Sequence, residues 1–209
     1  MTRGGDTGGV APRRDARGGR GPRLRVVAGS VGGRRLGAPP EVRPTTARVR
    51  EALFDSLGDA VVDAAVLDLY AGTGALALEA LSRGAARAVL VDDAPAAVAA
   101  CEANVEATGF GAAARVRRAP ATAFVAGPPP PEAPFALVLV DPPYDVASDE
   151  VPAVLAGLTR PGWLSGHARV VVETASGDPP PEAPPGLDVR SRRRYGDTLL
   201  STLGPVPGS

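Results

Sequence analysis

The stretch AVLDLYAGTGALALEALSRG, residues 65–84, decides the fold of this chain. Residues 65–70 form an apolar run with the length of one buried strand, and residues 74–83 place apolar side chains at helical spacing. Between them, Gly72 and Gly74 permit a tight turn from strand to helix. A strand that leads directly into a helix is typical of a βαβ unit, so the stretch predicts an α/β protein.

The same alternation continues along the rest of the chain. Helices are expected over residues 46–57, 95–107 and 149–157, the first with Thr45 or Thr46 as its N-cap. Further strands are expected over residues 88–91, 114–117, 135–140, 168–174, 187–192 and 198–203, and a hairpin pairs residues 24–28 with 34–36. Strands separated by helices predict a doubly wound, mostly parallel, Rossmann-like sheet.

Length and composition restrict the class of protein further. A chain of 209 residues has room for one substantial α/β domain, over residues 23–204. We expect a basic disordered tail over 1–22, an N-terminal extension over 23–58, a core over 59–204 and a second tail over 205–209. The formal net charge is zero, and the sequence contains Arg but no Lys. Arg supplies forked donors suited to phosphate.

The cysteine count and the hydropathy pattern point to the cytoplasm. Cys101 is the only cysteine, which excludes an internal disulfide and a multi-cysteine zinc site. We expect it to be a small buried side chain on a helix, and we predict no metal site. The chain has no apolar stretch of the ~18 residues that a membrane span requires. The sequence predicts a cytoplasmic monomer without a membrane partner.

Two carboxylates accompany the glycine turn. Asp68 lies within the first strand, and Asp92 follows the second strand about twenty residues after the turn. In doubly wound sheets, ligands bind beyond the carboxyl ends of the strands, where a glycine turn exposes backbone N–H groups and an acidic side chain accepts from ribose hydroxyls. Ala77 and its neighbours occupy the region of the third glycine of the dinucleotide fingerprint, which disfavours NAD. The pattern indicates a nucleoside-containing cofactor.

The motif Asp141-Pro142-Pro143-Tyr144 ends the apolar strand over residues 135–140. An exocyclic base amine is a weak nucleophile because its lone pair is delocalised into the ring. If the carboxylate of Asp141 and the carbonyl of Pro142 accept its N–H groups, the lone pair becomes available, while Tyr144 stacks on the base. A strand-ending turn would also explain Asp-Pro-Pro. Behind a cofactor-type strand, the motif favours methyl transfer from S-adenosylmethionine (AdoMet), with Asp141 orienting the amine.

Four runs of this sequence resemble the RsmD-type bacterial 16S rRNA (guanine-N2)-methyltransferases. They are RPTTARVREALF at 43–54, LDLYAGTGALALEALSRG at 67–84, DPPY at 141–144 and YGDT at 195–198, within a similarity over about residues 24–203. The resemblance implies a seven-stranded class I methyltransferase fold whose last strand is antiparallel, with a small hairpin and helix extension. It also implies AdoMet as donor and one guanine amine of 16S rRNA, or of the small-subunit particle, as acceptor.

Carried over by position, the resemblance implies roles for five residues of the glycine turn and the second strand. Asp68, Gly72 and Gly74 would hold the methionyl part of AdoMet, Tyr70 lies in the same run, and Asp92 would hold the ribose. The family more often has Glu at the position of Asp92, and an acidic residue where this chain has Ala94. Ala119 and Pro120 offer no side-chain acceptor for the adenine amine, so backbone groups would supply it.

Basic residues near the predicted first helix are candidates for RNA contacts. A cluster of five arginines would bind RNA phosphates: Arg34, Arg35, Arg43, Arg48 and Arg50. Arg50 could instead pair with Glu51 or Asp55 on a solvated helix face. A second run, residues 192–194, lies in a predicted strand, whose alternation sends its first and third members to one face and the second to the other.

Three other functions remain open. A DNA amino-methyltransferase uses the same motif but usually carries a separate recognition domain, for which this length leaves no room. A protein glutamine methyltransferase typically has Asn where this chain has Asp141. The third alternative is a catalytically weak RNA-binding module in ribosome assembly, supported by the shorter side chain of Asp92 and by Ala94.

Overall fold

The fold is built on a seven-stranded sheet. The computed structural model describes residues 1, 24–39, 46–143 and 147–207, the first three residues of the last segment by their backbone alone. The strand order is β3-β2-β1-β4-β5-β7-β6. Its members are β1 (Ala65–Leu69), β2 (Arg87–Asp92), β3 (Ala114–Arg118), β4 (Phe135–Val140), β5 (Leu164–Ala175), β6 (Leu187–Tyr195) and β7 (Thr198–Pro205).

Strand direction divides the sheet into two parts. The strands β3, β2, β1, β4 and β5 pair in parallel, whereas β7 is antiparallel to both β5 and β6. The order reverses between β1 and β4, which is where open α/β sheets bind ligands. This arrangement confirms the predicted class I methyltransferase fold, a Rossmann-like, mostly parallel sheet with an antiparallel last strand.

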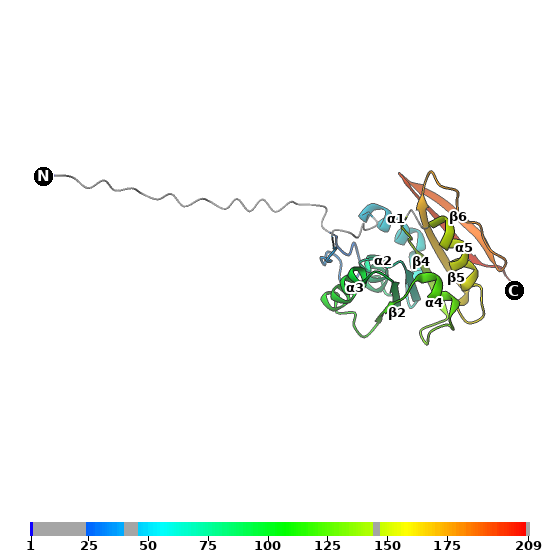
Figure 1. Ribbon diagram of the computed structural model, residues 1–209, viewed down its shortest axis with the longest axis horizontal. Helices are drawn as coiled ribbons and strands as arrows, with labels where there is room; N and C mark the ends of the chain where they lie inside the picture. The colour runs from blue at the N-terminus through cyan, green and yellow to red at the C-terminus, as the bar shows by residue number, and fades with distance from the viewer. Residues whose placement is uncertain (2–23, 40–45, 144–146, 208–209) are drawn as a thin grey trace.

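Helices cover both faces of the sheet (Figure 1). They are α1 (Ala47–Leu57), the 3-10 helix η1 (Gly58–Val61), α2 (Ala75–Ser82), α3 (Pro95–Thr108), α4 (Ala121–Ala126) and α5 (Ala147–Leu158). The buried side chains of α1, α2 and α3 form one hydrophobic cluster with one face of the sheet. Those of α4 and α5 form a second cluster with the opposite face. Every residue of β1 is buried, because this central strand lies between the two layers.

The differences from the sequence prediction are local. We missed α4 and η1, which have only 6 and 4 residues, too short for a periodic pattern to emerge. The strand β7 includes Pro205, so the predicted C-terminal tail over residues 205–209 begins too early. Arg190 Nη2 donates to Pro205 O at 2.6 Å, and the N–H of Val206 donates to Gly186 O at 3.1 Å. These bonds join the end of the strand to the rest of the fold.

The N-terminal extension is tied to the core through α2. Its predicted hairpin exists as one antiparallel bridge between Arg25 and Arg35. Gly29 has a φ of +85°, and a Cβ there would lie 1.9 Å from Ser82 O. Only glycine allows this approach, in which the N–H of Ser30 donates to the same carbonyl at 2.7 Å. The hairpin therefore packs directly on the end of α2.

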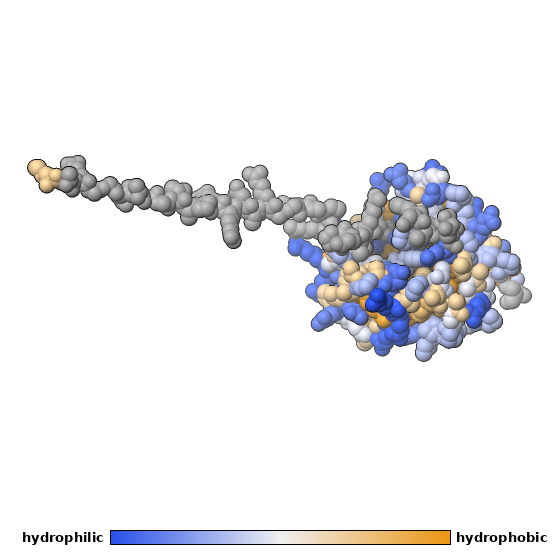
Figure 2. Space-filling model, in the orientation of Figure 1, coloured by the Kyte–Doolittle hydropathy of each residue, from blue (hydrophilic) through white to orange (hydrophobic). Residues whose placement is uncertain are grey.

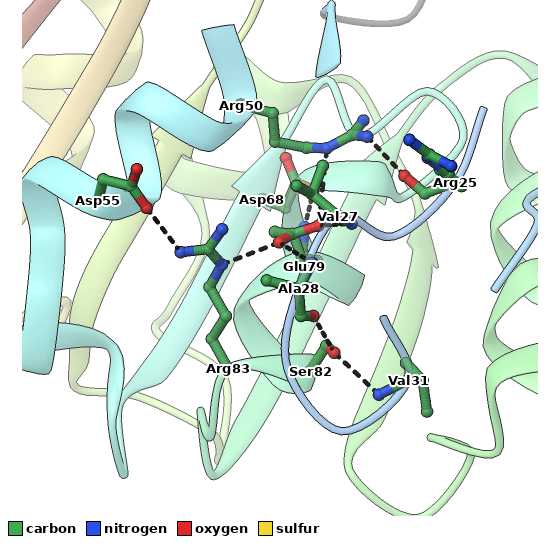
Figure 3. A network of polar contacts seen from close by, with 11 residues as sticks. Arg25, Val27, Ala28, Val31, Arg50, Asp55, Asp68, Glu79, Ser82 and Arg83 are labelled. Carbon is green, nitrogen blue, oxygen red and sulfur yellow. Dashed lines mark hydrogen bonds and ion pairs between the residues drawn. The ribbon is translucent and has the colours of Figure 1, made fainter. Parts of the chain in front are cut away.

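A buried carboxylate completes the attachment (Figure 3). Glu79 of α2 accepts from the backbone N–H groups of Val27 at 2.6 Å and Ala28 at 3.0 Å. Its carboxylate also meets Arg83 Nε at 2.8 Å and Arg50 Nε at 3.7 Å. We call these residues, Val27, Ala28, Arg50, Glu79 and Arg83, the Glu79 clamp. It joins the hairpin, α1 and α2 through one charge.

The surface of the described residues has few large apolar side chains. Hydrophilic and apolar residues are interspersed on the face seen in Figure 2. Among the described residues, the exposed large hydrophobic side chains are Met1, Val62 and Val189. No helix among them is long and apolar enough to cross a membrane.

Candidate functional site

Three acidic residues meet at the carboxyl edge of the sheet. Leu69 pairs with both Val91 and Val140, so Asp92 and Asp141, which follow these partners, lie on either side of the end of β1. Asp68 is one residue before Leu69. Side chains alternate along a strand, which places all three carboxylates on the sheet face that packs against α1, α2 and α3. The fold thus brings together residues that are up to 73 positions apart in the sequence, Asp68 and Asp141.

The turn between β1 and α2 has left-handed backbone at several positions. The φ angles are +62° at Tyr70, +57° at Gly72 and +76° at Gly74. A Cβ at Gly74 would lie 2.7 Å from Leu90 Cδ2 and 3.3 Å from Cys101 Sγ. Glycine at this position therefore serves the close packing of the turn on β2 and α3, as well as the left-handed backbone.

Asp92 holds the glycine turn in place. Its Oδ2 accepts from the N–H of Gly72 at 2.8 Å, and its Oδ1 accepts from the N–H of Ala94 at 3.0 Å. Each carboxylate oxygen has a second lone pair, so these bonds leave acceptor capacity for a ligand hydroxyl. The shorter side chain that we noted in the sequence thus has a local function, because it fixes the turn to the end of β2.

Asp68 is completely buried and only half satisfied. Its Oδ2 accepts from the N–H of Ala77, in the first turn of α2, at 3.0 Å. Its Oδ1 has no hydrogen-bond partner among the described residues. Burial raises the pKa of Asp68 to about 8, and the charges of Asp141 and Asp92 act in the same direction. A cationic ligand would relieve both conditions, because it supplies a partner for Oδ1 and favours the ionised carboxylate.

Tyr70 and Cys101 border this carboxylate group. The hydroxyl of Tyr70 donates to Glu150 Oε2 of α5 at 2.6 Å. Burial is the main cause that raises the pKa of the phenol, and the bond to Glu150 raises it further. Cys101 is buried on α3, as predicted, and its thiol donates to Gly72 O at 3.3 Å. Burial raises the pKa of the Cys101 thiol, with further contributions from Asp68 and Asp92. The thiol is therefore a neutral packing group.

The loop after β4 begins at the site. The N–H of Asp141 donates to Leu69 O at 3.4 Å, which fixes the start of the motif against the end of β1. The side chain of Asp141 is partly exposed, Pro142 is buried and Pro143 is exposed. Tyr144, the predicted stacking residue, lies outside the described residues. The described part of the motif thus extends from the sheet directly beside the glycine turn.

A fourth acidic side chain, which the sequence analysis missed, adjoins Asp141. Val140 pairs with Val172, so Glu173, which lies within β5, is level with Asp141, which follows β4, and is on the same face of the sheet. Thr198 Oγ1 donates to Glu173 Oε1 at 3.4 Å. Burial raises the pKa of Glu173 to about 8, and the charge of Asp141 adds to the effect. A local signal existed, because Glu173 follows the apolar run 170–172 as Asp141 follows the run 135–140, but only the pairing of β4 with β5 brings the two side by side.

The predicted arginine cluster divides in the structure. Arg34, Arg35 and Arg48 are exposed, and their side chains form no hydrogen bond or ion pair with the described residues. Arg43 lies outside the described part of the chain. The prediction that Arg50 binds RNA is wrong, because its side chain is completely buried in the Glu79 clamp and donates to Arg25 O at 2.5 Å. Its partner is Glu79, and neither Glu51 nor Asp55 as the sequence suggested.

A cavity of about 370 Å³ lies away from the acidic edge, between the end of α1 and the β5–β7–β6 part of the sheet. Its lining includes four groups that can carry positive charge and no acidic residue: His167, Arg169, Arg190 and Arg193. Arg192 and Arg194 instead donate to Pro181 O and Ser176 O, as the predicted alternation requires. We call this cavity the basic pocket. Its chemistry suits an anion, whereas the acidic edge suits a cation.

The sheet order, the glycine turn and the Asp-Pro-Pro loop define a class I methyltransferase fold. Among solved structures, the fold is similar to that of ribosomal protein L11 methylase from Lactobacillus delbrueckii subsp. bulgaricus, with a TM-score of 0.59 at 15% identity over 80% of this chain and 83% of that chain. The likeness is greater to yhhF from Escherichia coli, with a TM-score of 0.78 at 33% identity over 88% of this chain and 98% of that chain. No group of three or more His, Cys, Asp or Glu side chains suited to a metal ion occurs among the described residues.

Sequence comparison identifies the family within this class. The family described as "Conserved hypothetical protein 95" matches residues 24–204. The chain is 41% identical over 153 residues to "Ribosomal RNA small subunit methyltransferase D" of Escherichia coli (strain K12), covering 72% of this chain and 74% of the relative. It is 30% identical over 159 residues to the protein of the same name from Haemophilus influenzae, covering 75% and 81%. The chain belongs to this family, the RsmD-type methyltransferases.

Proposed function

We propose that this protein transfers a methyl group from AdoMet to the exocyclic N2 amine of a guanine in small-subunit (16S) rRNA. The observation that carries the proposal is the position of Asp141. Asp141 follows β4 directly beside the glycine turn of β1, and its backbone N–H donates to Leu69 O at 3.4 Å. A carboxylate that can accept hydrogen bonds from an amine and a turn typical of cofactor sites thus occupy the same edge of the sheet. Family membership and the names of the relatives support rRNA as the acceptor.

The residues of the acidic edge fit the donor. When bound, AdoMet supplies an electrophilic methyl group attached to a cationic sulfur. The buried Oδ1 of Asp68, which has no partner among the described residues, offers an acceptor and a negative charge to a cationic ligand. Asp92 retains lone pairs for ribose hydroxyls while it holds Gly72. Asp68, Tyr70, Gly72, Gly74 and Asp92 would therefore form the cofactor site.

Asp141 acts on the amine of the base. Its carboxylate and the carbonyl of Pro142 accept the two N–H groups, which withdraws the nitrogen lone pair from the ring and directs it toward the donor. The nitrogen would bond to the methyl carbon as the bond from that carbon to the sulfur of the donor breaks, which leaves a neutral thioether. The cationic amine would then lose one proton to water. The amine is inaccessible within a stacked helix, so a flipped or unpaired guanine enters beside Asp141, Pro142, Pro143 and Tyr144.

Cationic side chains away from the acidic edge would hold the RNA backbone. Arg34, Arg35 and Arg48 are exposed and have no partner among the described residues, and Arg43 belongs to the same sequence cluster. The basic pocket adds four further groups on another part of the surface. Phosphate contacts of this kind position an RNA without reading its bases. The base would then be selected at the acidic edge.

Labelled-methyl transfer tests the proposal. Small-subunit particles and free 16S rRNA from a strain that lacks this gene are incubated with the protein and labelled AdoMet, and the products are digested to nucleosides. We expect the label in N2-methylguanosine. Label in adenosine, cytidine, DNA or protein would refute the acceptor assignment. An absence of AdoMet binding at millimolar concentration, measured by calorimetry, would refute methyl transfer and favour an RNA-binding assembly module.

A further inference from the structure

Glu173 is a buried acid that neither the cofactor site nor the role of Asp141 uses. Glu173 is only 9% exposed, although its side chain ends in a carboxyl group. It lies in the last part of β5, level with the end of β4, and the pairing of Val140 with Val172 makes it the neighbour of Asp141 on the same face of the sheet. The two carboxyl groups influence each other electrostatically. Glu173 therefore adjoins the group that would hold the base amine.

Packing alone does not account for a carboxyl group at this position. Burying a carboxyl group costs free energy unless hydrogen bonds or an opposite charge compensate for it. The described residues supply Glu173 with one hydroxyl, Thr198 Oγ1 at 3.4 Å, and with no salt bridge. Asp141 adds a like charge. Uncompensated groups of this kind cluster at binding and catalytic sites, where a ligand supplies the missing partner.

Thr198 gives Glu173 a defined direction. It is the last residue of the run 195–198 and the first residue of β7, and it pairs with Ala175, two residues beyond Glu173. Its hydroxyl donates to Oε1 of Glu173, which orients the carboxyl group from the side of β7. The carboxyl group thus has a contact on the side of β7, and its strand lies between β7 and β4, after which Asp141 follows.

Strand order determines which part of the ligand lies over Glu173. The strands β1 and β2 carry Asp68 and Asp92, and the turn after β1 carries Gly72; all of these lie on one side of Asp141. The strand β5 lies on the other side. If the donor occupies the β1–β2 side and Asp141 holds the amine, the rest of the base edge extends over β5. The group next to the amine then meets Glu173.

The chemistry of that edge differs among the bases. In guanine, the N2 amine is followed by the N1–H donor and then by the O6 acceptor. In adenine and cytosine, the group next to the amine is a ring nitrogen that only accepts. A protonated carboxyl group matches guanine, because one oxygen accepts from N1–H while its O–H donates to O6. The raised pKa of Glu173, about 8, keeps this form populated at neutral pH.

We propose that Glu173 is a base-recognition residue, whose carboxyl group binds the N1–H and O6 edge of the guanine that Asp141 holds by its amine. This inference rests on the proposed function and adds the group that selects guanine. Thr198 is a positioning residue, since it acts through the carboxyl group of Glu173.

The test uses the target guanine identified by the labelled-methyl experiment, and RNA in which 2-aminopurine replaces that guanine. The analogue keeps the 2-amino group but lacks N1–H and O6. We expect the wild-type protein to methylate it at least ~100-fold more slowly in kcat/KM, because a site built to bind a polar group rejects an analogue without it. Equal rates on both RNAs would overturn the inference without any variant.

Two substitutions extend the test. Glu173→Gln keeps an acceptor for N1–H and a donor for O6, so we expect the preference for guanine to persist within ~10-fold. Glu173→Leu removes both, and we expect the preference to disappear, because the rate falls on guanine RNA and changes little on the analogue. A preference that survives Glu173→Leu, or an equal fall on both RNAs, would contradict base recognition.

Controls separate this inference from the function on which it rests. Glu182→Gln, at an exposed position, should change neither rate. Calorimetry should show wild-type AdoMet affinity in both Glu173 variants, since the residue lies on the base side of Asp141. If the wild-type protein does not methylate guanine at all, the proposed function fails. If it does so without discriminating against 2-aminopurine, only the role of Glu173 fails.

Discussion

Two groups of buried ionisable side chains in this protein differ in what surrounds them. In the Glu79 clamp, one carboxylate contacts two guanidinium groups and two backbone N–H groups. At the acidic edge, Asp68 and Glu173 adjoin a third carboxyl group, that of Asp141, and form no salt bridge with the described residues. The first arrangement brings opposite charges together, although Arg50 Nε and Nη1 have no hydrogen-bond partner among the described residues, and the second brings carboxyl groups together without a cation. We therefore expect the Glu79 clamp to serve stability and the acidic edge to serve ligand binding.

The largest effect should come from the acidic edge. We expect Asp141→Ala to reduce methyl transfer by about 1,000-fold, because the amine loses the acceptor that orients its lone pair. AdoMet affinity, measured by calorimetry, should remain within a few fold of wild type. Asp178→Ala removes an exposed carboxylate and serves as the matched control. An equal loss of transfer and of cofactor binding would show that Asp141 belongs to the cofactor site.

Removing the central charge of the clamp should instead affect stability. We expect Glu79→Gln to destabilise the fold by about 3–5 kcal/mol, because it leaves the buried guanidinium of Arg50 without an opposite charge. Thermal unfolding should show a Tm lower by about 10 °C. Glu106→Gln, an exposed position on α3, is the control and should leave Tm unchanged. A wild-type Tm for Glu79→Gln would mean that the clamp does not depend on charge.

The pH dependence of stability should separate the two groups of charges. The pKa of Asp68 and the pKa of Glu173 are each raised to about 8 in the folded protein, above the values of about 4 expected for the unfolded chain. The folded state therefore binds these protons more tightly, and their contribution to stability is complete below about pH 4 and is lost as the pH rises through 8. We expect Tm to fall less between pH 5 and 9 in Asp68→Asn and Glu173→Gln. A wild-type slope in both variants would contradict the raised pKa values.

The smallest effects should come from the exposed cations. We expect Arg48→Gln and Arg193→Gln each to reduce the slope of log affinity for RNA against log salt concentration by about one, because each removes one phosphate contact. Filter binding between 50 and 200 mM salt would measure this slope. Arg115→Gln is the control, since Arg115 bonds to the carbonyl of Gly111. An unchanged slope for Arg193→Gln would remove the basic pocket from the RNA interface.

The sequence predicted the framework well where local patterns are strong. The strand over residues 135–140 was placed correctly to the residue, and Thr46 caps α1 with its Oγ1 3.3 Å from the N–H of Val49. Short elements such as α4 were not predicted, because six residues are too few to show a clear periodic pattern. Glu173 was not predicted as a site residue, for a different reason. Its significance depends on the pairing of β4 with β5, which no local pattern contains.

Arg50 illustrates the limit most clearly. In the sequence it stands beside Arg48 and looks equally suited to bind phosphate. In the structure, α1 turns Arg48 toward solvent and Arg50 into the core, where Glu79 is its partner from 29 positions away in the chain. Helical geometry separates neighbours onto different faces, but only packing decides which face is buried.

The sequence by itself determined the class of fold, the glycine turn and the chemistry offered by Asp68, Asp92 and Asp141. These follow from strand and helix periodicity and from residue type, which are local properties. Only the tertiary structure decided which charges meet. It paired Arg50 with Glu79, joined Asp92 to Gly72, and set Glu173 beside Asp141. The physical reason is that burial and proximity shift a pKa or neutralise a charge. Both arise from the pairing register of strands that lie far apart in the sequence.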